Sequence, residues 1–114
     1  MDDLASKNCL ACEAGTPPFT KEEAEKYFGE ISDWELVDDA GKLKIRKRFK
    51  FGTYMEGIDF VNGVAKIAES EDHHPDMFAG FKKVTVNLTT HVAGGLTEND
   101  FIMAAKIDKL LREF

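Results

Sequence analysis

Apolar and basic residues alternate with a period of two over residues 43–51. The apolar positions are Leu43, Ile45, Phe49 and Phe51, and the basic positions are Lys44, Arg46, Arg48 and Lys50. This alternation predicts a β-strand with one face on a core and the other in water. A shorter strand is expected over residues 34–37. The turn-forming residues 38–41, in which Gly41 can adopt positive φ, would join the two strands into a hairpin.

A second hairpin is expected from residues 77–81 and 84–90, with its turn at Lys82 and Lys83. In its second strand one face is apolar, with Val84, Val86 and Leu88. The opposite face carries Thr85, Asn87, Thr89 and, if the pleat stays regular, His91. The glycine pair at residues 94–95 then breaks the strand.

Three segments with helical periodicity each begin with a threonine three positions ahead of an acidic residue, the signature of a capping box. The pairs are Thr20 with Glu23, Thr53 with Glu56, and Thr97 with Asp100. We expect the first helix to reach about Glu30. The third helix has Met103, Ile107, Leu110 and Phe114 on one side. The second should end near His73, because Pro75 disfavours helical geometry in the residue before it.

The second helix carries two apolar stripes, separated by about 100° around its axis. The first consists of Tyr54, Ile58, Val61, Ala65 and Ala68, and the second of Phe60, Val64 and Ile67. One sheet does not need an apolar surface this wide. We therefore expect the helix to be buried on two sides, at the interface of a homo-oligomer.

Together the segments follow the order α-β-β-α-β-β-α. This order predicts an α+β fold, a four-stranded and mostly antiparallel sheet with three helices packed on one face. Residues 19–114 are expected to form one domain. Residues 1–18, with Gly15, Pro17 and Pro18 near their end, are expected to form an N-terminal tail.

Composition narrows the class of protein. The chain has 114 residues, of which 43% are hydrophobic and 32% charged, as in soluble globular domains. Its formal net charge of −6 argues against direct binding to nucleic acid. No apolar run approaches the roughly 20 residues of a membrane span, and the N-terminus lacks the pattern of a secretory signal. A cytoplasmic location is the default expectation.

The two cysteines, Cys9 and Cys12, have the spacing of half a zinc site or of a redox pair. A zinc site would need further ligands, and the histidines lie far away in the sequence. A redox pair would be expected between a strand and a helix, whereas these residues precede the prolines at 17–18. A loosely ordered tail is the favoured interpretation.

The residues best suited to chemistry lie in the segment 69–75, which contains His73 and His74, and at the third histidine, His91. Glu69 and His73 are four positions apart and would share one face of the last helical turn. His74 would then point elsewhere, so the two histidines could flank a pocket from different directions. Imidazole gives or takes a proton near neutral pH, which suits acid–base catalysis.

Several of these features have simpler interpretations. A histidine at a helix C-terminus often interacts with the helix dipole alone, and Asp100 is explained by its capping box. Three histidines could also bind zinc, although adjacent ligands such as His73 and His74 diverge. The basic strand face is more simply a solvated surface than a site for anions, and Trp34 is more simply a core residue.

These residues resemble the signature of the pterin-4a-carbinolamine dehydratases. The resemblance rests on Glu69-x3-His73-His74-Pro75, an aromatic at Phe81, His91 and Asp100. It extends to Trp34, Phe49-x-Phe51 and the segment 94–98, and it spans roughly residues 18–111. The family has a four-stranded antiparallel sheet with three helices on one side, usually in dimers or tetramers.

The resemblance implies the dehydration of a 4a-hydroxytetrahydropterin to quinonoid dihydropterin, in the recycling of tetrahydropterin, without a metal or organic cofactor. The catalytic set carried over by position is His73, His74 and His91, supported by Glu69 and Asp100. The residues expected to contact the pterin are Asp72, Pro75, Met77, Phe78, Thr89 and Thr90. His74 and His91 are expected as acid and base, with His73 holding the hydroxyl group.

Two positions depart from the family pattern. Met77 stands where many members carry Trp, and Phe81 stands where Tyr or Trp is common. Both residues remain apolar, but Phe81 cannot donate a hydroxyl hydrogen bond, which affects the expected pterin preference. Animal relatives also act as dimerisation cofactors of a homeodomain transcription factor. An interaction module that binds a partner through Phe60, Val64 and Ile67 of the second helix is therefore an alternative function. A metal-dependent hydrolase built on the three histidines is another.

Overall fold

The computed structural model describes residues 3–11 and 15–114. In this part of the chain the elements are η1 (Leu4–Ser6), α1 (Lys21–Glu25), η2 (Phe28–Glu30), β1 (Glu35–Asp39), β2 (Lys42–Lys50), α2 (Tyr54–Glu71), β3 (Asp76–Ala79), β4 (Lys83–Leu88), η3 (His91–Ala93) and α3 (Glu98–Leu111), where η marks a short 3-10 turn. The predicted α+β class and order of helices and strands are confirmed. No helix among these residues is both long and apolar enough to cross a membrane.

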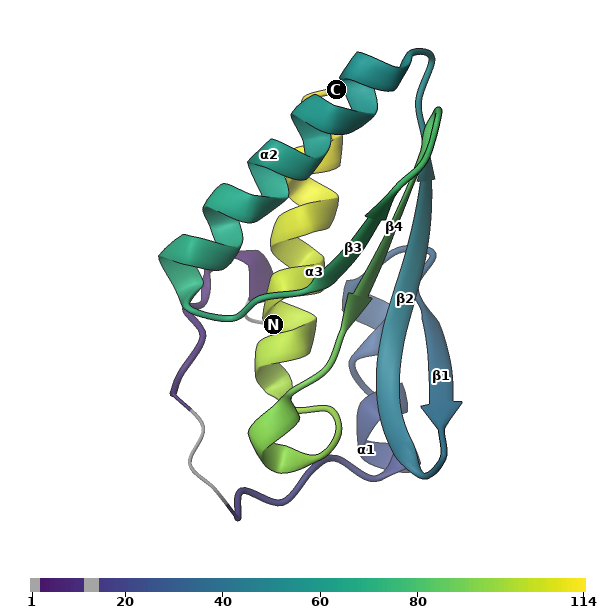
Figure 1. Cartoon of the computed structure of the whole chain (residues 1–114). Helices are drawn as coiled ribbons and strands as arrows, with labels where there is room; N and C mark the ends of the chain where they lie inside the picture. The colour runs from purple at the N-terminus through teal and green to yellow at the C-terminus, as the bar shows by residue number, and fades with distance from the viewer. Residues whose placement is uncertain (1–2, 12–14) are drawn as a thin grey trace.

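The sheet is antiparallel throughout the described residues, with its four strands in the order β1-β2-β4-β3. α2 and α3 lie across one of its faces (Figure 1). The β2–β4 register places Ile45 opposite Leu88 and Phe49 opposite Val84, and all of these side chains are buried. Both predicted strand patterns therefore face the core as expected.

Lys47 lies on the core-facing side of β2, between Ile45 and Phe49, and is buried with a relative exposure of 7%. Its Nζ lies 2.8 Å from Oδ1 of Asp108 on α3. The same carboxylate accepts hydrogen bonds from the Trp34 indole and from the Ser32 amide. An ammonium group is tolerated in this core because a hydrogen-bonded carboxylate neutralises it. The sequence pattern did not predict this pair.

The basic outer face of β2 is paired with acidic residues rather than gathered into an anion site. Arg48 lies 3.6 Å from Glu35, and Lys44 lies 3.6 Å from Asp39. These pairs join β2 to β1 along a partly solvated surface. The arrangement agrees with the simpler interpretation of these basic residues.

Helix α1 is shorter than predicted and gives way to the 3-10 turn η2. The predicted capping box of Thr20 and Glu23 is present, but the helix ends at Glu25. The rings of Tyr27 and Phe28 both pack on Phe101, at centroid distances of 5.0 and 5.7 Å. We attribute the early end to this packing and to Gly29, which has low helix propensity.

Helix α2 ends at Glu71, two residues before the predicted end at His73. Asp72 adopts the left-handed conformation with φ 52°, and its amide donates to the carbonyl of Ala68. The amide of His73 also donates to that carbonyl. This αL cap closes the helix and redirects the chain before Pro75 acts.

Strand β4 also ends earlier than predicted, at Leu88. Thr90 forms an isolated bridge with Gly95, and Gly94 closes the intervening turn with φ 73°. His91 begins η3 inside this turn. The predicted position of His91 on the polar face of a regular strand is therefore wrong.

The described part of the N-terminal segment is packed. Leu4 is only 2% exposed, and the amide of Cys9 donates to Oε1 of Glu71 at 2.7 Å. The expectation of loose order is therefore wrong around Cys9, because long-range contacts hold the segment. Cys12 lies outside the described residues. The predicted domain boundary at residue 19 stays a prediction.

Candidate active site

His73 is held by the buried carboxylate of Asp100. Nε2 of His73 lies 2.7 Å from Oδ1 of Asp100, whose side chain is fully buried. Oδ2 of Asp100 accepts hydrogen bonds from the Thr97 amide at 3.0 Å and from the Thr90 hydroxyl at 2.8 Å. The predicted capping role of Asp100 is thus confirmed, and the same side chain orients His73. Both roles follow from its position in the first turn of α3.

His74 pairs with Glu69. Nε2 of His74 lies 2.5 Å from Oε2 of Glu69, and the two side chains are 54% and 78% exposed. The sequence predicted instead that Glu69 shares a helical face with His73. That prediction is wrong because α2 ends at Glu71 and the left-handed Asp72 turns the chain. His73 then faces α3, and His74 lies back along the last turn of α2.

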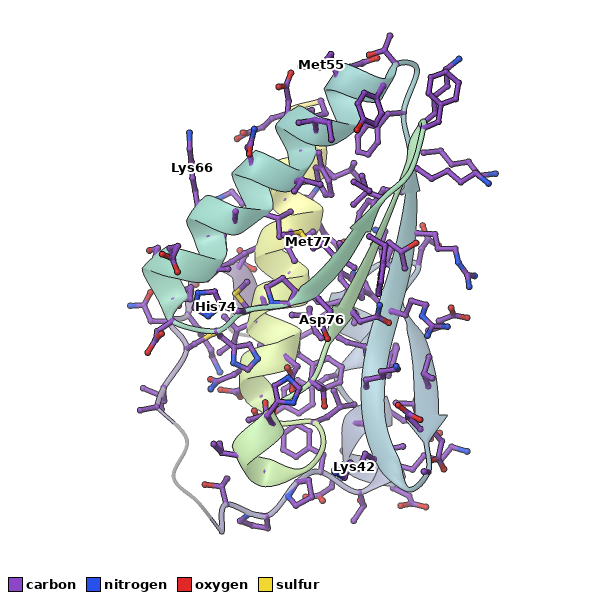
Figure 2. The ribbon with its side chains drawn as sticks, in the orientation of Figure 1. Lys42, Met55, Lys66, His74, Asp76 and Met77 are labelled. Carbon is purple, nitrogen blue, oxygen red and sulfur yellow. The ribbon has the colours of Figure 1, made fainter. Side chains whose placement is uncertain are left out.

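A single pocket of ≈ 310 Å³ gathers the three histidines. Its lining residues are Leu10, Ala11, Asp72, His73, His74, Thr89, Thr90, His91, Val92 and Asn99. The histidines come from two connections, the one between α2 and β3 and the turn η3. Figure 2 shows His74 just beyond the end of α2, with Asp76 and Met77 following toward the sheet. The pocket therefore lies where the helical layer meets one end of the sheet.

A second hollow of ≈ 180 Å³ adjoins this pocket and shares Thr89, Thr90 and His91 with it. It extends toward Lys42 and Asp76. His91 borders both hollows and is exposed, so its imidazole is accessible to a molecule bound in either one.

Of the residues expected to contact a substrate, Asp72, Thr89 and Thr90 line the larger pocket, whereas Pro75, Met77 and Phe78 do not. Met77 lies opposite Val86 on β4 and packs against the core. Phe78 lies opposite Thr85 and is 65% exposed. Contact of these three residues with a substrate stays a prediction.

Phe81 lies in the turn between β3 and β4 and is 73% exposed. The Nζ of Lys82 lies 5.1 Å from the centroid of its ring. Phe81 is absent from the lining of both histidine-bearing hollows. An effect of this departure on pterin preference therefore also stays a prediction.

Four further residues line the pocket and were not predicted from the sequence: Leu10, Ala11, Val92 and Asn99. Asn99 precedes Asp100 in the first turn of α3, and this adjacency was a usable signal. Leu10 and Ala11 carried no signal, because only the fold brings the N-terminal segment to the pocket. Among the described residues, no group of three His, Cys, Asp or Glu side chains is placed to hold a metal ion.

Cys9 lies beside this pocket without lining it. Burial, and next the carboxylate of Glu71, raise the pKa of its thiol to about 12. Its Sγ donates to the carbonyl of Asn99 at 3.6 Å. A thiol with this pKa remains protonated near neutral pH and is a poor nucleophile or metal ligand there.

A family model and several relatives match this chain. Residues 17–110 match the model of the pterin 4 alpha carbinolamine dehydratase family. The chain is 47% identical over 110 residues to a protein of Nitrosomonas eutropha that is provisionally named a pterin-4-alpha-carbinolamine dehydratase, covering 96% of this chain and 94% of the relative. A protein of Methylococcus capsulatus with the same provisional name is also 47% identical, covering 96% of this chain and 95% of the relative.

Two solved structures are similar in fold. One is a transcriptional coactivator/pterin dehydratase from Brucella melitensis, with a TM-score of 0.75 and 33% identity, covering 82% of this chain and 97% of that chain. The other is a pterin dehydratase-like protein described as a RuBisCO assembly factor in the alpha-carboxysome. It has a TM-score of 0.59 and 25% identity, covering 68% of this chain and 88% of that chain.

Proposed function

This chain belongs to the pterin 4 alpha carbinolamine dehydratase family, and we propose that it dehydrates a 4a-hydroxytetrahydropterin to quinonoid dihydropterin in tetrahydropterin recycling. The observation that carries the proposal is the pocket that His73, His74 and His91 share. A base removes the proton from N5, and the electron pair of that N–H bond forms the C4a=N5 double bond. The C4a–O bond breaks, and an acid protonates the departing oxygen to give water.

In this proposal His74 and His91 are the acid and base, and His73 holds the hydroxyl group. Their surroundings support the division. His73 is nearly buried against Asp100, and such a paired imidazole is suited to a fixed orientation. His74 is more exposed, and His91 is also exposed, so both can exchange protons with solvent between turnovers. Histidine suits both roles because its proton affinity matches neutral pH.

The chain's own residues also provide a site for the pterin ring. Asp72, Thr89 and Thr90 line the pocket, and their carboxylate and hydroxyl groups are proposed to hydrogen-bond the polar edge of the ring. Thr89 already donates to the carbonyl of Leu43, and Thr90 to Asp100. These bonds support the ring site because they fix the positions of both hydroxyl oxygens.

The test is a stopped-flow ultraviolet assay with freshly generated 4a-hydroxytetrahydropterin. We expect replacement of His74 or His91 by Ala to lower kcat by roughly a hundredfold or more, the usual contribution of a general acid or base. Replacement of His73 by Ala should have a smaller effect on kcat. Lys66→Ala is the control, because Lys66 lies on α2 apart from His74 (Figure 2) and should change nothing.

Each variant must give a native circular dichroism spectrum before its rate is compared. A folded wild-type protein that does not exceed the buffer rate would overturn the dehydratase proposal. Equal losses for all three histidine variants would leave the dehydratase in place and remove the proposed division of roles.

A second function, as an interaction module, is favoured by the stripe of α2 that contains Tyr54, Ile58 and Ala65, here called the outer stripe. The expectation that Phe60 and Val64 bind the partner is wrong, because both side chains are buried in the core. Tyr54 is 48% exposed, and Ile58 and Ala65 are half-buried on the same stripe. The similar solved structure described as a transcriptional coactivator/pterin dehydratase supports this alternative. We propose that the main role of this face is self-association of the chain into a homodimer or homotetramer. We further propose that the protein does not bind nucleic acid directly. A cytoplasmic location is part of the same proposal.

A further inference from the structure

We propose that residues 3–11, here called the N-terminal strap, form a wall of the substrate pocket, and that Leu10 contacts the bound pterin and determines its affinity. The inference rests on the proposed function, because it takes the pocket's ligand to be a pterin. Leu10 and Ala11 both line the pocket that the histidines share. The family model matches residues 17–110, so this wall lies outside the region that the model covers.

The side chain of Asn99 clips the strap at Leu10. The Leu10 amide donates to Oδ1 of Asn99 at 2.9 Å, and Nδ2 of Asn99 donates to the Leu10 carbonyl at 2.6 Å. Asn99 is only 7% exposed, so this reciprocal pair is largely shielded from water. The pair fixes the backbone of Leu10 next to Asp100, the residue that orients His73.

The rest of the strap is anchored to both helices that carry the site. The Cys9 amide donates to Glu71 at the end of α2, and Lys106 of α3 donates to the carbonyl of Ala5. Leu4 is buried in the core. These contacts hold the strap against both α2 and α3 and thereby fix the position of Leu10.

Leu10 is itself 76% exposed although its backbone is fixed. Most of the other residues that line the pocket are histidine, threonine, aspartate and asparagine, and Ala11 and Val92 are the other apolar members. A pterin ring has hydrogen-bonding edges and flat apolar faces. The polar residues suit the edges, and Leu10 is left to cover a face.

Contact with a ring face is equally available before and during the loss of water. Such a contact contributes uniform binding, which lowers KM and leaves kcat unchanged. This behaviour separates Leu10 from the histidines, whose removal acts on kcat. It also separates Leu10 from a residue that only supports the fold.

The experiment compares Leu10→Ala with Leu10→Met and the wild type in the stopped-flow assay. We expect Leu10→Ala to raise KM by roughly tenfold, as losses of apolar contact in a pocket do, with kcat within about twofold of wild type. Leu10→Met should restore most of the affinity. Met55→Ala is the matched control, because Met55 is an exposed apolar residue, 60% exposed, at the opposite end of α2 from His74 (Figure 2).

Asn99→Ala tests the clip. It should raise KM about as much as Leu10→Ala, and the double variant should be no worse than either single variant, because residues in one network are not additive. Additive increases in KM would show that Asn99 acts independently of Leu10 and would overturn the clip.

Calorimetric titration with 7,8-dihydrobiopterin, a stable pterin, separates this inference from the proposed activity. If Leu10→Ala binds dihydrobiopterin more weakly than the wild type does, the role of Leu10 as a wall of the pocket is supported. A wild type that binds dihydrobiopterin but shows no dehydration would overturn the proposed activity alone. Unchanged KM and unchanged dihydrobiopterin affinity in Leu10→Ala would overturn the wall while leaving the dehydratase intact. A wild type that binds no dihydrobiopterin would overturn the wall as well.

Discussion

Asp100 both caps the N-terminus of α3 and orients His73, a candidate catalytic residue. One carboxylate oxygen accepts from the Thr97 amide and the Thr90 hydroxyl, and the other pairs with His73. A buried carboxylate of this kind is tolerated because each oxygen has a hydrogen-bond partner. The order of the imidazole therefore depends on the first turn of α3.

At this scale we predict that Asp100→Asn lowers both stability and activity. Only one atom of the amide can accept a hydrogen bond. Either Thr97 and Thr90 lose their acceptor, or His73 faces an amide nitrogen in place of a carboxylate oxygen. The expected loss of unfolding free energy is about 1–3 kcal/mol, as for other buried hydrogen-bond partners. We expect kcat to fall by roughly tenfold or more through the mispositioned histidine.

Chemical denaturation and the stopped-flow assay measure these two effects. Glu98→Gln is the control, because it removes a charge from the same end of α3 but Glu98 contacts Tyr27 and Lys7 rather than His73. An Asp100→Asn variant with wild-type kcat would show that His73 does not need this carboxylate.

At the scale of elements, β2 and α3 are joined by a charged pair inside an apolar layer. Lys47 and Asp108 have side-chain exposures of 7% and 8%. Because side chains alternate between the two faces of β2, Lys47 points toward the core, where Asp108 of α3 supplies the opposite charge. Trp34 and Ser32 bond the same carboxylate, so the segment before β1 depends on it as well.

We predict that Asp108→Asn destabilises the protein by about 3–5 kcal/mol, because it leaves the Lys47 charge buried without a counter-ion. The double variant Lys47→Met/Asp108→Asn should recover part of that loss, since it removes the unpaired charge. Urea unfolding gives both values.

The matched comparison is Asp39→Asn, which breaks the exposed pair with Lys44. It should cost less than about 1 kcal/mol, as surface ion pairs usually do. Equal costs for the two aspartate variants would contradict the importance assigned to the buried pair.

At the scale of the whole molecule, the single chain leaves an apolar stripe of α2 incompletely covered. Phe60 and Val64 of one stripe are buried in the core. On the other stripe Ala68 is buried, whereas Tyr54 is exposed and Ile58 and Ala65 are half-buried. The two stripes expected from the sequence thus have different environments. Self-association would cover the outer stripe.

We predict that the wild type sediments as a homodimer or homotetramer and that Ile58→Asp shifts it to a smaller species, because a charge is costly in an apolar interface. Analytical ultracentrifugation measures the shift. Lys66→Asp is the control for an acidic substitution elsewhere on α2. A monomeric wild type, or an Ile58→Asp variant that sediments like wild type, would overturn this assignment of the face.

Local patterns in the sequence determined the order of elements. The alternation of Ile45 and Phe49 with basic residues predicted β2, and the threonine caps located the starts of the helices. These signals are readable because each depends on residues a few positions apart. The same patterns placed His73, His74 and His91 near element ends, and the histidine signature identified the family.

Tertiary structure alone decided the partners within the site. His73 pairs with Asp100 and His74 with Glu69 because a left-handed Asp72 ends α2 early, and the direction of a side chain depends on that one backbone angle. Lys47 finds Asp108, and Leu10 reaches the pocket, through contacts between residues far apart in the chain. A short-range pattern in the sequence cannot predict such pairs, because they depend on how the helices, the sheet and the N-terminal segment pack together.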